Sequence, residues 1–253
     1  LYKLGKPRIS FFSFSCCEGC QLMVLNLEED LLALAEHVDI VSFREAMTEH
    51  SDDYDIVFIE GSITTPSDLE QVKKLRERAK VVVALGACAT MGGVNMMKNL
   101  VGVDKAKEIV YGDKAHYFES IPTMPIDQAV KVDYYIHGCP IALDEFLEVT
   151  KSILIGRRPR IPNYPVCVEC QMKENVCVFD VGKVCLGPIT RAGCKAICPT
   201  YGHGCEGCRG LIDDPNASSH KNVLTEHGLT VEEAVERYKM FGSGWKFVME
   251  TKK

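Results

Sequence analysis

Thirteen cysteines dominate the reactive side chains of this 253-residue chain, and their positions are far from even. Five of them lie among the first 139 residues, and eight lie between Cys167 and Cys208. The count is odd, and a chain of this length can build a core without disulfide staples. In a reducing compartment, this many thiols indicates metal binding before it indicates disulfide bonds.

The first group of cysteines lies where three expected parallel strands end. Cys17 and Cys20 follow the apolar run that ends at residue 14. Cys88 follows the run that ends at residue 85, and Cys139 follows the run that ends at residue 136. Open α/β sheets bind ligands at the carboxyl ends of their strands, so these four thiolates are expected to meet at one place. The glycines beside them let the backbone approach a bulky centre and donate N–H groups to sulfur.

Several interpretations of this group remain open from the residues alone. Buried cysteines can be small apolar residues, and four cysteines also suit zinc. An iron–sulfur cluster is favoured by the Cys139-Pro140 pair and by the presence of eight further cysteines in the chain. Cys16 could replace Cys20 as a ligand, although the pair Cys17 and Cys20 is favoured. Glu60 also ends an expected strand, either as a surface or helix-entry acid or as a group that supports the ligands.

The second group of eight cysteines divides into two sets of four, the number that one [4Fe–4S] cluster takes. Zinc ribbons place paired CxxC motifs about 15–20 residues apart, whereas 34 residues lie between the two CxxC pairs here. A disulfide module is disfavoured in a reducing compartment. His137 and His203 lie inside cysteine motifs and could tune a neighbouring sulfur, although packing roles are commoner. The eight are Cys167, Cys170, Cys177, Cys185, Cys194, Cys198, Cys205 and Cys208.

The elements that must position the first group alternate between strands and helices. Apolar runs predict strands at residues 8–14, 38–43, 55–59, 80–85 and 132–136. Apolar spacing predicts helices at residues 21–36, 67–79 and 142–154, the second opened by a capping box of Ser67 and Glu70. This alternation predicts an α/β domain with a doubly wound parallel sheet.

Three prolines between Gly156 and Pro165 predict a connector, because proline neither continues a helix nor pairs inside a sheet. We therefore expect one domain at residues 1–156, carrying one cluster, and a cysteine-rich domain at 157–253, carrying two more. Residues 166–210 have little periodicity, so inorganic centres are expected to supply most of the second core. A last helix is expected near Val231–Phe241, capped by Thr230 with Glu233 at the capping-box position.

Composition excludes several classes of function. The net charge of −6 argues against non-specific nucleic-acid binding, and no apolar run is long enough for a membrane helix. No catalytic triad, phosphate-binding glycine loop or paired-carboxylate pattern is visible, so no catalytic residue is expected. No export signal opens the chain, which favours the cytoplasm.

Taken together, these motifs resemble those of the small subunits of [NiFe]-hydrogenases. The family's proximal-cluster pattern is matched by Cys17-Glu-Gly-Cys20, Glu60-Gly-Ser-Ile63, Gly86-Ala-Cys-Ala-Thr-Met-Gly92 and His137-Gly-Cys-Pro140. The distal and medial segments are matched by Cys185-Leu-Gly-Pro-Ile-Thr-Arg-Ala-Gly-Cys194 and Gly202-His-Gly-Cys-Glu-Gly-Cys208. The resemblance covers about residues 8–208.

The resemblance implies a flavodoxin-like first domain followed by a small irregular iron–sulfur domain. It implies three [4Fe–4S] clusters: proximal at Cys17, Cys20, Cys88 and Cys139; distal at Cys167, Cys170, Cys177 and Cys185; medial at Cys194, Cys198, Cys205 and Cys208. Membrane-bound and periplasmic members have histidine where Cys167 stands and proline near Cys198, so the resemblance is to a cytosolic subgroup.

The implied role is electron transfer between a partner large subunit, which carries the Ni–Fe centre, and acceptor subunits of the flavin/NAD(P) or ferredoxin type. Two other classes of function are weighed against it. One is the quinone-linked cluster subunit of respiratory complex I, which the eight-cysteine tail disfavours. The other is a stand-alone ferredoxin-like carrier, for which a parallel-sheet domain would be needless.

Overall fold

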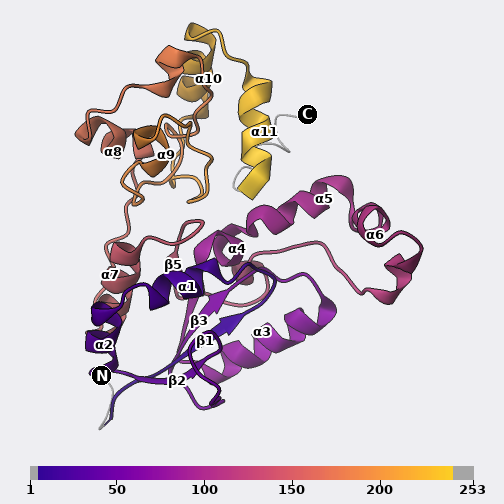
Figure 1. Ribbon diagram of the computed structural model, residues 1–253, viewed down its shortest axis with the longest axis vertical. Coiled ribbons are helices and arrows are strands. Elements are labelled where there is room, and N and C mark those ends of the chain that lie inside the picture. Colours follow the sequence, from indigo (N-terminus) through magenta and orange to yellow (C-terminus); the bar gives the residue numbers. More distant parts are fainter. Residues whose placement is uncertain (1–4, 242–253) are drawn as a thin grey trace. The chain divides into compact units, whose positions relative to one another are not determined.

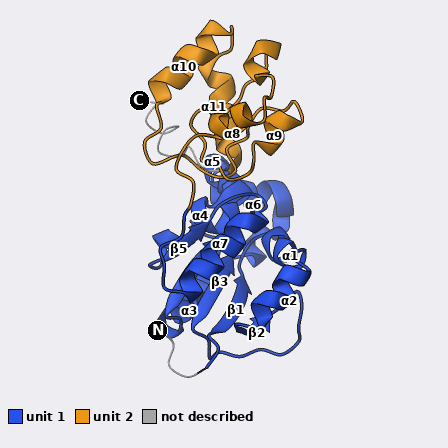
Figure 2. Cartoon of the chain, turned by 90° about the vertical axis from the view of Figure 1, so that its left-hand side faces the viewer, with its two compact units in different colours: residues 1–160 blue, residues 161–253 orange. Residues whose placement is uncertain are grey.

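The computed structural model describes residues 5–241. The chain forms two compact units that divide between Arg160 and Ile161, inside the connector expected from the prolines (Figure 2). Each unit is described by itself below.

Unit 1 is built on a five-stranded sheet in which every neighbouring pair of strands is parallel (Figure 1). The strand order is β2-β1-β3-β4-β5, the flavodoxin-like order in which the direction of winding reverses between β1 and β3. The predicted α/β doubly wound sheet is therefore confirmed. The strands are β1 Arg8–Ser13, β2 Asp39–Phe43, β3 Ile56–Glu60, β4 Val81–Leu85 and β5 Tyr134–Ile136.

Helices cover both faces of this sheet because successive strand residues point to opposite sides. On one face, Phe11 and Phe58 stack with ring centroids 5.0 Å apart, and Phe146 of α7 (Leu143–Leu154) lies 5.4 Å from the Phe58 ring. On the other face, Val72 and Leu75 of α3 (Pro66–Arg78) belong to a buried cluster with alternate residues of β3 and β4. The sheet is thus buried on both sides, as its β-branched strands predict.

The predicted start of α3 is wrong. The capping box is formed by Thr65 and Asp68 rather than by Ser67 and Glu70. The residue after Thr65 is a proline, which is favoured at the first helical position. The helix therefore begins at Pro66, earlier than the pattern of Ser67 and Glu70 indicated.

The single helix predicted at residues 21–36 is two short helices, α1 (Gly19–Leu25) and α2 (Glu29–Ala35). The backbone of Glu28 has φ 49°, outside the helical region, and this interrupts the apolar stripe. Leu32 of α2 is 71% exposed.

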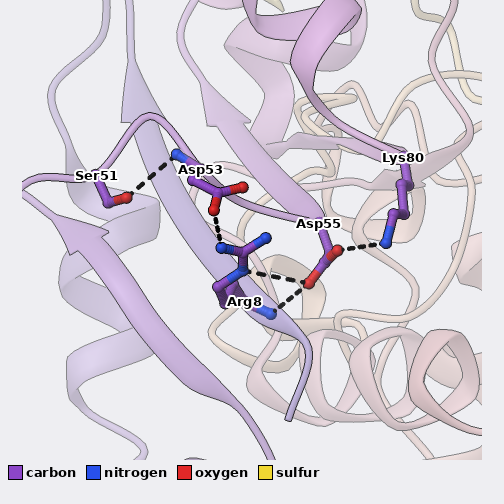
Figure 3. Close-up of polar contacts among 5 residues, drawn as sticks. All are labelled: Arg8, Ser51, Asp53, Asp55 and Lys80. Carbon is purple, nitrogen blue, oxygen red and sulfur yellow. Dashed lines mark hydrogen bonds and ion pairs between the residues drawn. The ribbon is translucent and has the colours of Figure 1, made fainter. Parts of the chain in front are cut away.

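Buried Asp55 joins three strands at the amino-terminal edge of the sheet (Figure 3). Its carboxylate accepts hydrogen bonds from the Arg8 backbone N–H at 2.8 Å and from Lys80 Nζ at 2.7 Å. Its backbone carbonyl also accepts from the N–H groups of Lys80 and Val81. One buried acid therefore ties the start of β3 to the chain entering β1 and β4.

The segment between β4 and β5 consists of short helices that the sequence pattern did not predict. In chain order these are α4 Gly86–Met91, η1 Gly93–Met96, α5 Met97–Val101, α6 Val103–Tyr111, η2 Gly112–Tyr117 and η3 Ile126–Gln128.

Unit 2 has an apolar core, contrary to the expectation that inorganic centres supply most of it. Leu224 of α10 (Ala217–Glu226) and Tyr238 of α11 (Val231–Phe241) are buried among Phe179, Leu186 and other apolar side chains. The expectation was wrong because residues 166–210 themselves supply Val166, Phe179, Leu186 and most of the other buried residues of this core, despite their lack of periodicity. The α11 capping box of Thr230 and Glu233 is confirmed.

The other helices of unit 2 are short: α8 Val166–Met172, η4 Val178–Val181 and α9 Ile197–Thr200. In residues 5–241, no helix is both long enough and apolar enough to cross a membrane.

Candidate metal centres

The three loops expected to carry the first ligand set meet at the carboxyl edge of the sheet. Cys17 and Cys20 follow β1, Cys88 lies in α4 directly after β4, and Cys139 follows β5. The Ala87 N–H donates to the Gly138 carbonyl at 2.7 Å, which fastens the loop after β4 to the loop after β5. The topology therefore brings ligand-type side chains from distant parts of the sequence to one edge.

The electrostatics of these thiols show that they are neighbours. Burial, followed by the charges of Cys139 and Cys17, raises the pKa of the Cys88 thiol to about 12. Burial and then the charge of Cys17 also raise the pKa of Cys139. Cys20 is buried, and its pKa is raised by burial first, with further contributions from Glu60 and Cys139. The four expected ligands thus form one group.

Glu60 supports this group from the last position of β3. Its side chain is buried, and its two carboxylate oxygens accept from the backbone N–H groups of Cys20 and Gln21, each at 3.1 Å. The interpretation as a surface acid is wrong, because Glu60 is only 2% exposed. The carboxylate caps the first turn of α1 and fixes the backbone of the Cys17–Cys20 loop.

Two glycines leave room for the sulfurs. A Cβ at Gly86, where φ is +83°, would lie 2.3 Å from Cys20 Sγ, and a Cβ at Gly93 would lie 2.7 Å from Cys88 Sγ. Any side chain at either position would have to displace a ligand-type sulfur. Glycine is therefore required here by the space that the thiols occupy as well as by the left-handed backbone.

Cys16 lies close to the first set, and its thiol has a backbone hydrogen-bond partner. Its thiol donates a hydrogen bond to the Phe14 carbonyl at 3.4 Å. Burial, followed by the charge of Glu60, raises its pKa to about 12, as burial also raises the pKa of Cys88, so the pKa does not separate Cys16 from the expected ligands. This contact favours Cys20 over Cys16 as the second ligand of the loop.

In unit 2, the cysteines from Cys167 to Cys185 form one neighbourhood. Burial and then the charges of Cys185, Cys170 and Cys177 raise the pKa of Cys167 to about 12. Cys185 Sγ accepts backbone N–H bonds from Gly187 at 3.4 Å and from Cys205 at 3.2 Å. Such N–H donors stabilise charge on a sulfur ligand.

The cysteines from Cys194 to Cys208 form two neighbouring pairs, Cys194 with Cys198 and Cys205 with Cys208, and Cys205 also lies near Cys185. Burial and then the charge of Cys194 raise the pKa of Cys198, while burial raises that of Cys205, whose neighbours include Cys208. The sequence pattern did not single out Glu169, which lies between Cys167 and Cys170 in the sequence.

The Glu169 carboxylate holds the loop that contains Cys194. It accepts from the N–H groups of Gly193 at 2.9 Å and Ala196 at 3.1 Å. Lys195 and Ala196 both have positive φ, an uncommon backbone for residues other than glycine. The loop that contains Cys194 is therefore stabilised by Glu169, which lies between Cys167 and Cys170 of the other expected ligand set.

The two histidines show no contact with sulfur among their described interactions. The His137 backbone N–H donates to Glu145 at 3.1 Å, and its ring lies parallel to that of Tyr135. His203 is exposed, and its backbone N–H donates to the Cys198 carbonyl at 2.9 Å. The backbone of His203, rather than its ring, closes the turn after Cys198.

The donor chemistry of four thiols suits either a zinc ion or an iron–sulfur cluster. Within residues 5–241, no three His, Cys, Asp or Glu side chains lie close enough to hold a single ion. A zinc site would bring four sulfurs to about 2.3 Å from one atom, whereas a cubane cluster spreads its four ligands over four irons. The raised pKa values also mean that iron must displace protons from these thiols when it binds.

The chain is similar to several known proteins. The family model described as "NADH ubiquinone oxidoreductase, 20 Kd subunit" matches residues 17–153. Sulfhydrogenase 2 subunit delta of Pyrococcus furiosus is 36% identical over 224 residues, covering 87% of this chain and 92% of that protein. A subunit of the F420-non-reducing hydrogenase vhu of Methanococcus voltae is 32% identical over 240 residues, covering 83% of this chain and 84% of that one.

Among solved structures, a chain of an NAD+-reducing [NiFe]-hydrogenase in the H2-reduced state matches with a TM-score of 0.56 and 29% identity. The match covers 62% of this chain and 96% of that chain.

Proposed function

Because the chain belongs to the family of the NADH:ubiquinone oxidoreductase 20-kDa subunit and, within it, to the hydrogenase small subunits, we propose that it is the electron-transfer subunit of a [NiFe]-hydrogenase. The observation that carries the proposal is the grouping of its thiols. Four follow strands at the carboxyl edge of the sheet, Cys167 has Cys170, Cys177 and Cys185 as neighbours, and the remaining four lie in two neighbouring pairs. The assembled enzyme is an oxidoreductase that acts on hydrogen.

The proposed cofactors are three [4Fe–4S] clusters, each of which carries one electron at a time. The ligand sets are those expected from the resemblance: Cys17, Cys20, Cys88 and Cys139; Cys167, Cys170, Cys177 and Cys185; Cys194, Cys198, Cys205 and Cys208. Glu60 would hold the loop of the first set through its bonds from the Cys20 and Gln21 N–H groups. The Cys205 N–H bond to Cys185 would support the second set, and the Gly193 N–H bond to Glu169 would support the third.

The chain is proposed to move electrons and to leave hydrogen activation to a partner. Four-cysteine sites have no open coordination position, whereas activating a small molecule requires one. A large subunit would hold the Ni–Fe centre, and flavin/NAD(P) or ferredoxin-type subunits would receive the electrons. The similarity to a chain of an NAD+-reducing enzyme supports a nicotinamide-linked acceptor.

A cytoplasmic location is proposed from two ligand positions. Cys167 stands where the membrane-bound and periplasmic members of the family have histidine, and Cys198 stands near the position of their proline. Cysteine at both positions supports a cytosolic form with three four-iron clusters.

The main alternative is a quinone-linked subunit like that of complex I. The family model that matches is named after such a subunit, but its match ends at residue 153 and leaves out all eight cysteines of unit 2. The relatives that extend through most of the chain are named as hydrogenase subunits. The hydrogenase proposal therefore accounts for more of the molecule.

The test is the metal content and activity of protein prepared without oxygen. We expect about 12 irons and about 12 sulfides per chain, and no hydrogen turnover by the chain alone. In the assembled complex, Cys88→Ser should impair electron exit far more than hydrogen–deuterium exchange at the partner's metal. Zinc near stoichiometry with little iron, or hydrogen turnover by the isolated chain, would overturn the proposal.

A further inference from the structure

Two segments of unit 2 that carry ligands of different proposed clusters are held against each other. One contains Cys185, of the Cys167–Cys185 set, and the other contains Cys205, of the Cys194–Cys208 set. The Leu186 backbone N–H donates to the Cys205 carbonyl at 3.0 Å. A Cβ at Gly204 would lie 1.9 Å from the Val184 carbonyl oxygen, so only glycine permits this approach.

The contact continues from backbone to sulfur. The Cys205 N–H donates to Cys185 Sγ at 3.2 Å, so a ligand of one set is hydrogen-bonded to the main chain of a ligand of the other. Gly187 adjoins this contact between Cys185 and Cys205. A Cβ at Gly187 would be 3.2 Å from Cys185 Sγ, 3.5 Å from Cys167 Sγ and 3.8 Å from Cys205 Cβ. Cys185 and Cys205 are 5% and 6% exposed, so little water reaches the contact.

We propose that the Cys205 N–H···Sγ Cys185 hydrogen bond is the bridge through which electrons pass between the two clusters of unit 2. The inference rests on the proposed function, because it needs both ligand sets. Electron transfer weakens steeply with distance through space and less steeply through covalent and hydrogen bonds. From the cluster on Cys205, the path crosses one side chain, one N–H and one hydrogen bond to reach a sulfur of the other cluster.

The step is a simple exchange of one electron. The cluster that gives the electron is oxidised by one unit, the cluster that receives it is reduced by one unit, and no bond forms or breaks. Neither residue donates or accepts a proton, since the N–H stays on Cys205 throughout. The bridge works in either direction, so it serves both hydrogen uptake and hydrogen evolution.

Gly204→Ala tests the bridge in the assembled enzyme, because the added methyl group must push the Cys205 segment away from Val184. Gly202→Ala is the matched control: it lies two positions away and has φ +72°, yet a Cβ there meets no atom within 4 Å. Gly187→Ala is a milder second variant, since its Cβ would meet sulfur atoms rather than backbone.

Three measurements are made on each protein: iron content, the spin–spin interaction between the two reduced clusters by electron paramagnetic resonance, and their electron equilibration by rapid freeze-quench. With full iron, Gly204→Ala should weaken the interaction and slow equilibration several-fold, Gly187→Ala should do so to a smaller extent, and Gly202→Ala should match the unsubstituted enzyme. Unchanged coupling and equilibration in an iron-replete Gly204→Ala enzyme would overturn the bridge.

If Gly204→Ala does not assemble, the Gly187→Ala result decides alone: full iron with unchanged equilibration overturns the bridge, and slower equilibration supports it. Failure of the underlying function would look different. An unsubstituted chain with far fewer irons than three clusters require would contradict the ligand sets before any variant is made.

Discussion

Gly86→Ala should remove the cluster of unit 1 and leave those of unit 2 in place. The added Cβ would lie 2.3 Å from Cys20 Sγ, and side-chain carbons do not come closer than 3.0 Å to other atoms. The sulfur must therefore move by at least about 0.7 Å, several times the roughly 0.2 Å within which metal–ligand distances are held. In a chain without iron, the thiol can rotate away at little cost. In a loaded chain, that rotation breaks an iron–sulfur bond.

The left-handed backbone at Gly86 adds a separate cost. A residue other than glycine at φ +83° loses about 1–3 kcal/mol of stability. Gly102→Ala controls for this cost, because Gly102 has φ +95° and a Cβ there meets no atom within 4 Å. Gly86→Ala and Gly102→Ala should therefore lose a similar free energy of unfolding and differ in their iron content.

The assay is iron and sulfide analysis with quantitative electron paramagnetic resonance on enzyme purified without oxygen. Gly86→Ala should hold about 8 irons per chain and Gly102→Ala about 12, since each cubane contributes four. The signals that remain in Gly86→Ala should be those of unit 2. A full complement of iron in Gly86→Ala would refute the placement of Cys20 as a ligand.

Three further predictions concern other residues. Cys198→Pro should convert one cluster of unit 2 to a three-iron form with a new paramagnetic signal in the oxidised protein and a raised potential; an unchanged spectrum with full iron would mean that Cys198 is not a ligand. Cys16→Ala should keep about 12 irons, because the Cys16 thiol donates to the Phe14 carbonyl; loss of about four irons would assign it as a ligand. Asp55→Asn should cost about 1.5–3 kcal/mol in denaturant unfolding, the range for hydrogen bonds to a charged group. Although burial opposes it, the hydrogen bonds from Arg8 and Lys80 lower the pKa of Asp55. The stability that this carboxylate adds is therefore fully present above its pKa in the unfolded chain, about 3.9, and is lost as the pH falls through its lower pKa in the folded chain. The difference in free energy of unfolding between Asp55→Asn and the unsubstituted chain should therefore disappear in acid. A difference that does not change with pH would contradict this.

The sheet and the meeting of the first ligand set could be predicted without coordinates. Apolar β-branched runs are a local signal, and all five strands formed where those runs lie. The expected ligands of the first set follow β1, β4 and β5, and the carboxyl ends of parallel strands share one edge, so their meeting followed from order alone. The cysteine counts and spacings are properties of the sequence itself.

Local helix details could be predicted only in part, because a pattern of apolar residues does not determine backbone angles. The break between α1 and α2 depends on Glu28 at φ 49°, which the leucine spacing conceals. The apolar core of unit 2 was missed because its residues in the cysteine segment, such as Phe179 and Leu186, follow no helix or strand period and come together only in the folded chain.

How the ligand loops are held became visible only in the folded chain. Glu60 could be a surface acid until β3 places it under the backbone of Cys20, and Glu169 had no signal beyond its place between two cysteines. The contact between Cys205 and Cys185 joins residues 20 positions apart through one backbone N–H. Such hydrogen bonds depend on where a main chain runs in space, and side-chain type does not encode that, since every residue except proline carries the same N–H group.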